Sequence, residues 1–81
     1  MNELISSIGF TFSCKYFDFR YEYKEYFRYL YKEFKIDLYD DHYEFYNGSN
    51  WNKYALNDLT PLKKEFEREI RSFKLKQILN E

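Results

Sequence analysis

The stretch FKIDLYDDHYEFYNGSNWNKYAL, residues 34–56, decides the fold because it combines strand-like alternation with two turn signals. From Phe34 to Leu38 apolar and polar side chains alternate, which is typical of a strand with one buried face. Asp40-Asp41 favours a turn because its carboxylates can accept hydrogen bonds from nearby backbone amides. Asn47-Gly48 favours a tight hairpin turn, since both residues tolerate a positive φ. The stretch therefore predicts a small antiparallel meander over about residues 34–56.

The segment after the meander predicts an amphipathic helix over about residues 60–79. Thr60 suits the N-cap, and Pro61 loses no hydrogen bond at the first helical position. Apolar residues with helical spacing form the stripe expected to be buried, namely Leu62, Phe66, Ile70 and Phe73. Later apolar residues fall on other faces of the same helix: Leu75, Ile78 and Leu79. Either the helix ends near Ser72, or its last turn presents apolar side chains to a second surface.

The segment before the meander predicts a second amphipathic helix, over about residues 23–35. Its apolar stripe has helical spacing and consists of Tyr23, Phe27, Leu30 and Phe34. Basic residues cluster on the far side: Lys24, Arg28, Lys32 and Lys35. We therefore expect a helix with an aromatic inner face and a basic outer face.

The N-terminal third of the chain predicts a short helical turn followed by a strand. Asn2 can cap the turn, and Gly9 is a natural helix stop. From Phe10 to about Phe19 apolar residues alternate, with a one-residue shift at Tyr16-Phe17 that a β-bulge would explain. A long helix from Lys15 is the competing interpretation, so residues 15–22 stay open between strand and helix. The whole pattern predicts one α+β domain, residues 1–81, in which a small, mostly antiparallel sheet packs with two helices.

The composition sets further expectations. Aromatic residues make up 25% of the 81 residues, and ten of them are tyrosines, some of which must lie at the surface. The single cysteine, Cys14, cannot form an intramolecular disulfide, and its apolar neighbours favour a buried, unreactive thiol. No stretch resembles a signal peptide or a membrane span, so we expect a cytoplasmic location.

Acidic and aromatic residues gather in the meander, which is therefore the first candidate binding site. Residues 36–58 carry a net charge of −4, whereas the whole chain carries −1. Tyr and Trp can anchor a protein interface, and surrounding carboxylates would attract a basic partner. The candidate residues are Asp37, Tyr39, Asp40, Asp41, Tyr43, Glu44, Tyr46 and Trp51. The alternative is that the rings belong to the core and the acids only keep the hairpin soluble.

Metal binding and catalysis have little support in the sequence. Asp40, Asp41, His42 and Glu44 are potential metal ligands, but their spacing matches neither a calcium loop nor a zinc pattern. His42 is the only histidine, and no serine has a spacing from it that suggests a catalytic triad. We therefore expect no metal, no cofactor and no enzymatic activity.

Two alternative functions use other residues. A small DNA- or RNA-binding module would place basic helix faces against phosphates and stack tyrosines on bases. Its contact residues would be Lys24, Arg28, Lys32, Lys35, Lys64, Arg68 and Arg71. The slightly negative net charge argues against this function, because most nucleic-acid-binding domains are basic. The other alternative is a homodimerising structural or antitoxin-like protein.

In general character the chain resembles the small phage-encoded inhibitors of bacterial defence, such as anti-CRISPR proteins. The shared features are short length, an acidic aromatic surface and a lack of catalytic motifs. A further one is residue usage typical of A/T-rich genes: Phe, Tyr, Met, Ile, Asn and Lys supply 40 of the 81 residues. The resemblance implies a phage or mobile-element inhibitor that engages a basic, nucleic-acid-binding effector. These inhibitors share no common fold or motif, so no site residue is carried over from them.

Overall fold

Five antiparallel strands form one sheet whose spatial order, β1-β2-β3-β4-β5, is the same as their order along the chain. The computed structural model describes residues 2–79. Its elements are α1 Asn2–Ile8, β1 Thr11–Asp18, the 3-10 turn η1 Phe19–Tyr21, β2 Lys24–Tyr31, β3 Phe34–Leu38, β4 His42–Tyr46, β5 Trp51–Ala55 and α2 Thr60–Leu79. The predicted α+β class with a mostly antiparallel sheet is confirmed, and the sheet is not closed into a barrel.

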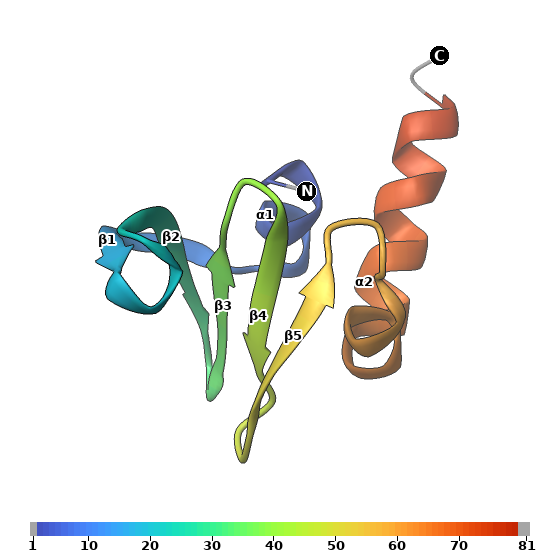
Figure 1. Ribbon diagram of the computed structural model, residues 1–81. Helices are drawn as coiled ribbons and strands as arrows, with labels where there is room; N and C mark the ends of the chain where they lie inside the picture. Colours follow the sequence, from blue (N-terminus) through green and yellow to red (C-terminus); the bar gives the residue numbers. More distant parts are fainter. Residues whose placement is uncertain (1, 80–81) are drawn as a thin grey trace.

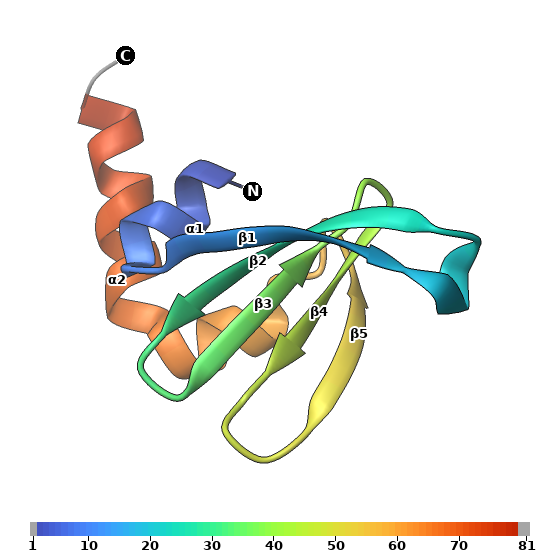
Figure 2. The same ribbon diagram turned by 90° about the vertical axis from the view of Figure 1, so that its left-hand side faces the viewer.

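Both helices lie on one side of the sheet, and the core lies between them and the strands (Figures 1 and 2). Four side chains in this layer are almost completely buried: Ile5 from α1, Ile36 from β3, Tyr43 from β4 and Leu62 from α2. Gly9 makes the sharp connection from α1 to β1, with a φ of +126°. A Cβ at this position would lie 2.9 Å from the Tyr31 ring, so both the conformation and the contact require glycine.

The predicted meander is confirmed in its strands and turns. β3 pairs with β4 and β4 pairs with β5, both antiparallel. In the β4–β5 turn, the Asn47 side-chain oxygen accepts hydrogen bonds from the amides of Ser49 and Asn50, and Gly48 has a φ of +98°. In the β3–β4 turn, the Tyr39 amide donates a hydrogen bond to the His42 carbonyl, whereas the Asp41 carboxylate binds the side chains of Lys24 and His42 rather than backbone amides.

The predicted helix over residues 23–35 is wrong, because this segment forms β2 and the turn into β3. Its side chains have strand spacing as well as helical spacing: Phe27, Tyr29 and Tyr31 lie two residues apart. Phe and Tyr favour strands, since their rings pack well on a pleated surface. The β2–β3 turn is only two residues long, and Lys32 adopts a positive φ of 52° there. Strand pairing on both sides of β2 therefore prevails over the helical pattern.

The open question over residues 15–22 is resolved as strand followed by turn. β1 continues to Asp18, and η1 then begins the connection to β2. Glu22 and Tyr23 complete the connection with positive φ values of 54° and 64°. The register shift lies between Phe12 and Cys14, so the bulge predicted at Tyr16-Phe17 is misplaced by about three residues.

Helix α2 begins where the sequence predicts, but it bends at Phe66. Thr60 is its first helical residue, and the Thr60 amide donates a hydrogen bond to the side chain of Asp58, two residues before it. At Phe66 the backbone leaves the helical region, with φ −130° and ψ 40°. The helix does not stop near Ser72, and Leu75 and Ile78 are exposed on its last turns. None of the described helices is long and apolar enough to cross a membrane.

Candidate binding surface

The sheet face that the helices do not cover, here called the open face, carries polar and aromatic side chains. In an antiparallel sheet, directly opposite residues share a face, so the register assigns Arg28, Asp37 and Glu44 to the open face. Asp37 and Glu44 are nevertheless buried. A buried carboxylate must be paired with a positive charge. Arg28 pairs with Asp37 and Arg20 pairs with Glu44, and these two arginines lie on the open face.

Arg28 of β2 and Asp37 of β3 form a two-pronged ion pair at the centre of the open face. Arg28 Nε lies 2.7 Å from Asp37 Oδ1, and Nη2 lies 2.8 Å from Oδ2. Such fork-to-fork pairs fix orientation as well as charge. The carboxylate raises the pKa of the guanidinium further above its already high usual value. Arg28 is therefore held in one position and stays charged.

Aromatic rings from both edges of the sheet surround this arginine. Its guanidinium carbon lies 5.2 Å from the Tyr16 ring centroid on β1 and 5.3 Å from the Trp51 ring on β5. β1 and β5 are the two edge strands, so the sheet must curve for both rings to reach one side chain. Tyr16 is 39% exposed and Trp51 is 40% exposed. The ring centroid of Tyr46 lies 5.4 Å from that of Trp51. We call Tyr16, Arg28, Tyr46 and Trp51 the Arg28 surface.

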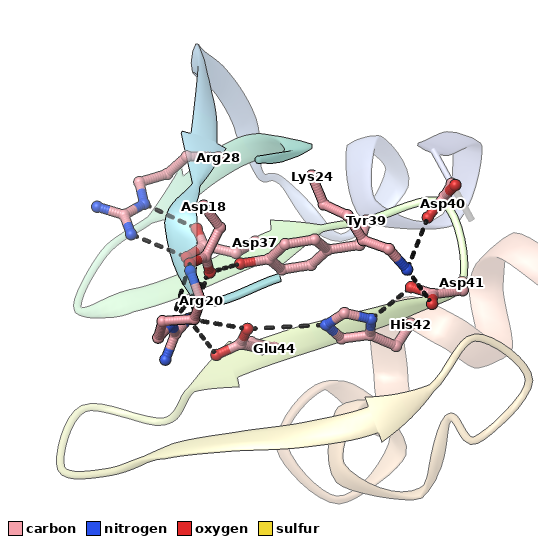
Figure 3. Close-up of polar contacts among 10 residues, drawn as sticks. All are labelled: Asp18, Arg20, Lys24, Arg28, Asp37, Tyr39, Asp40, Asp41, His42 and Glu44. Carbon is pink, nitrogen blue, oxygen red and sulfur yellow. Dashed lines mark hydrogen bonds and ion pairs between the residues drawn. The ribbon is translucent and has the colours of Figure 1, made fainter. Parts of the chain in front are cut away.

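A second arginine fastens the end of the β1–β2 hairpin to β4 (Figure 3). Asp18 is buried and accepts hydrogen bonds from the backbone amide and guanidinium of Arg20 and from the Tyr39 hydroxyl. Arg20 Nη2 also lies 3.3 Å from Glu44 Oε2. One guanidinium therefore joins carboxylates that are 26 positions apart in the chain. The hairpin end is held against the open face.

A row of stacked rings connects Tyr16 on β1 with the β3–β4 turn. Tyr26 stacks on Tyr16 at 5.4 Å and on Tyr39 at 4.9 Å, measured between ring centroids. Tyr39 also stacks on His42 at 4.1 Å. Burial, followed by the Asp18 carboxylate, raises the pKa of the Tyr39 hydroxyl, which donates a hydrogen bond to Asp18. The stack spans the sheet from β1 to β4.

At the β3–β4 turn, where this row of rings ends, Asp41 forms an ion pair with Lys24. Lys24 Nζ and His42 Nδ1 each lie 2.6 Å from an oxygen of Asp41. The hydrogen bond from Lys24, together with that from His42, lowers the pKa of the Asp41 carboxyl. Asp40 lies farther from Lys24, at 4.0 Å, and its side chain is 84% exposed.

The Asp18–Arg20 pair should make folding stability depend on pH in the acid range. The hydrogen bonds from Arg20 hold the pKa of Asp18 below its usual range, although burial opposes them. A lowered folded-state pKa contributes stability above the unfolded-state value of about 3.9, and this contribution is lost as the pH falls below it. We expect Asp18→Asn to cost about 1–3 kcal/mol at pH 7. The difference from wild type should shrink steadily below about pH 4, as measured by urea unfolding.

Glu65→Gln removes an exposed carboxylate of α2 and is the matched control for these unfolding measurements. Its free energy of unfolding should stay close to that of the wild type at every pH. If the difference between Asp18→Asn and wild type stays constant from pH 7 to pH 3, the pairing of Asp18 is not the source of the acid sensitivity.

The structure separates the residues of the predicted acidic binding site. Tyr43 is completely buried in the core, so its assignment to a protein-binding surface is wrong. Asp37, Tyr39 and Glu44 lie on the open face but are buried beneath Arg20 and Arg28, so they form no ring of exposed carboxylates. The predicted residues that remain at least partly exposed are Asp40, Asp41, Tyr46 and Trp51. The structure thus brings together the aromatic part of the predicted site and turns most of its acids inward.

The basic residues of the alternative nucleic-acid site do not share one surface either. Lys24, Arg28 and Lys35 occupy β2 and β3, and Lys32 lies in the turn between these strands. Lys64, Arg68 and Arg71 lie on α2, which covers the opposite face of the sheet. The predicted basic helix face over residues 23–35 does not exist, since that segment is a strand.

Several important residues of the open face escaped the sequence-based prediction, namely Tyr16, Asp18, Arg20 and Tyr26. The signal for them was present: once β1 and β2 are treated as a hairpin, Tyr16 lies opposite Tyr26 and Asp18 opposite Lys24. Without that hairpin the middle segment appeared helical, and no cross-strand pairing could be assigned.

Comparisons with known proteins add no identity. Protein-family models, curated proteins and solved structures all give no match to this chain. Within residues 2–79, no group of three or more His, Cys, Asp or Glu side chains is arranged to hold a metal ion. The chemistry of the open face itself must therefore support any functional proposal.

Proposed function

We propose that this chain is a non-catalytic protein-binding module whose contact surface is the Arg28 surface. The observation that carries the proposal is the fixed arginine at its centre, paired with Asp37 and flanked by the rings of Tyr16 and Trp51. Trp, Tyr and Arg are the residue types that contribute most of the binding energy in protein interfaces. Their position on a sheet, rather than on a loop, keeps them in place.

Preorganisation supports this choice. An arginine that is free in solution loses side-chain entropy when a partner orders it, whereas Arg28 has already lost that freedom in folding. The neighbouring rings have few rotatable bonds and are partly packed against one another. A partner therefore meets a surface that needs little further ordering, and more of the contact energy remains as affinity.

Single-stranded nucleic acid is the second candidate ligand of the open face. Its support is the series of stacked rings beside lysines, with Lys35 Nζ 5.6 Å from the Tyr46 ring. Stacking on exposed rings can hold bases without sequence preference. Arg20 and Arg28, however, already neutralise buried carboxylates, so neither is available as an uncompensated charge for phosphate. For this reason we rank protein binding first.

The expected chemistry of the protein partner comes from the sequence and from the two exposed acids of the β3–β4 turn. The sequence predicts a basic, nucleic-acid-binding effector, and the acids exposed to meet such a partner are now Asp40 and Asp41 at the β3–β4 turn. The likeness to phage-encoded inhibitors and the homo-oligomer alternative both remain predictions from the sequence.

A capture experiment tests the proposed surface. We expect the tagged wild-type chain to retain a specific protein from a lysate of its source organism. The double variant Tyr16→Ala/Trp51→Ala should retain it at least about 30-fold less, because even one interface anchor contributes about 2 kcal/mol or more. Leu75→Ala/Ile78→Ala removes two exposed apolar side chains from α2 and is the matched control. Circular dichroism of all three chains checks that each is folded.

Equal retention by the wild type and Tyr16→Ala/Trp51→Ala would rule out the Arg28 surface as the contact. The nucleic-acid candidate has a separate readout, because Trp51 is the only tryptophan and lies on this surface. Salt-reversible quenching of its fluorescence by oligothymidylate would favour nucleic acid over protein.

A further inference from the structure

The bend in α2 creates a concave surface on a single helix. A straight helix is convex, so its own side chains cannot enclose a groove. At Phe66 the backbone leaves the helical region, and the helix changes direction (Figures 1 and 2). A concavity of about 600 Å³ lies along it, with lining residues from both sides of the bend: Thr60, Lys63, Lys64, Glu67, Ile70, Arg71 and Lys74. We call this concavity the α2 groove.

The α2 groove is strongly basic. Four of its seven lining residues are cations, and the one acid, Glu67, forms an ion pair with Arg71. Lys63, Lys64 and Lys74 are exposed and form no ion pair within residues 2–79. Three uncompensated positive charges therefore surround one concavity, although the chain as a whole carries a charge of −1. Charge of this density attracts an anionic partner and sets its orientation.

The apolar surface of the α2 groove comes from the aliphatic stems of its long side chains, above the buried Ile70. Ile70 lines the groove but is only 2% exposed, so it lies at the bottom and belongs to the core. Lysine side chains add aliphatic stems to the walls while their ammonium groups reach solvent. The lining contains no aromatic ring on which a nucleic-acid base could stack. An anionic ligand with apolar side chains fits this surface better than a phosphate backbone.

We propose that the α2 groove binds a short acidic segment of a partner protein, one in which aspartates or glutamates alternate with aliphatic residues. The carboxylates pair with Lys63, Lys64 and Lys74, and an aliphatic side chain packs against the aliphatic stems of these lysines. This surface is separate from the Arg28 surface, because α2 and the open face lie on opposite sides of the sheet. The protein then has two independent contact sites of different chemistry.

Fluorescence anisotropy with synthetic probes tests the α2 groove without a known partner. The first probe is a labelled peptide of glutamates interrupted by leucines; the second has the same charge with serine in place of leucine. We expect the leucine peptide to bind the wild type more tightly than the serine peptide. The variant Lys64→Glu/Lys74→Glu should weaken binding of the leucine peptide at least about tenfold, since two attractions become repulsions.

The control variant Arg68→Glu/Lys76→Glu changes the net charge by the same amount but alters a different concavity of α2. It should leave binding of the leucine peptide within about twofold of the wild type. The proposal is overturned if the leucine peptide does not bind, if both variants lose binding equally, or if the serine peptide binds equally well. Tighter, Lys64- and Lys74-dependent binding of oligothymidylate with the same charge would also overturn it, in favour of nucleic acid.

Discussion

Replacing Phe66 with alanine should lower the free energy of unfolding more than any substitution at the surface of the sheet or helices. The Phe66 ring is 4% exposed and contacts four other rings: Phe10, Tyr31, Phe34 and Phe45. Truncation of a buried phenylalanine to alanine costs about 3–5 kcal/mol. At 0.05–0.15 kcal/mol per residue, a domain of 81 residues has only about 4–12 kcal/mol of folding free energy. The single substitution therefore removes a large part of the total.

Urea unfolding followed by circular dichroism measures this loss. Phe19→Ala makes the same chemical change on a ring that is 74% exposed, and should alter the free energy of unfolding by no more than about 0.5 kcal/mol. If Phe66→Ala and Phe19→Ala cost the same, the ring cluster around the bend of α2 is not the centre of the core.

The second large effect is expected at the centre of the open face. Arg28→Met removes the two hydrogen bonds to Asp37 and leaves this carboxylate buried without its main partner. Such an uncompensated buried charge costs about 3–5 kcal/mol. The double variant Arg28→Met/Asp37→Leu should recover most of this loss, because replacement of a whole buried pair by apolar residues is close to neutral.

Unfolding free energies of the wild type, both single variants and the double variant form a double-mutant cycle. We expect Asp37→Leu alone to cost less than Arg28→Met, since an arginine that is 27% exposed can still reach water. Additive effects of the two substitutions would show that Arg28 and Asp37 do not stabilise each other.

The parts of the fold that could be predicted are those with local signals. The meander was predictable because Asp40, Asn47 and Gly48 mark its turns directly. The start of α2 was predictable because Asp58, Thr60 and Pro61 end the preceding strand and suit a first helical turn. The bend at Phe66 has no local marker: neither glycine nor a second proline lies nearby, and contacts with rings of the sheet hold this residue.

The middle of the chain could not be assigned because aromatic residues occupy four of the six positions of YFRYLY, residues 26–31. With so many rings, the apolar positions fit both the helical spacing and the strand spacing. Only the pairing of this segment with β1 and β3 decides between the two. This one error changed the predicted site. A helix would have turned Arg28 away from the meander, whereas the strand places it opposite Asp37. The acids of the meander therefore appeared exposed when they are in fact paired.

The identical order of the strands in space and in sequence has a consequence for how the protein is made. Each hairpin can close as soon as its second strand has been synthesised, because no strand waits for a distant partner. The helix-covered face of the sheet, which includes Ile36 and Phe45, is buried only when α2 packs on it. Until α2 packs, this face of the sheet exposes apolar and aromatic side chains, so the chain is most prone to aggregation after the sheet has formed and before α2 has docked.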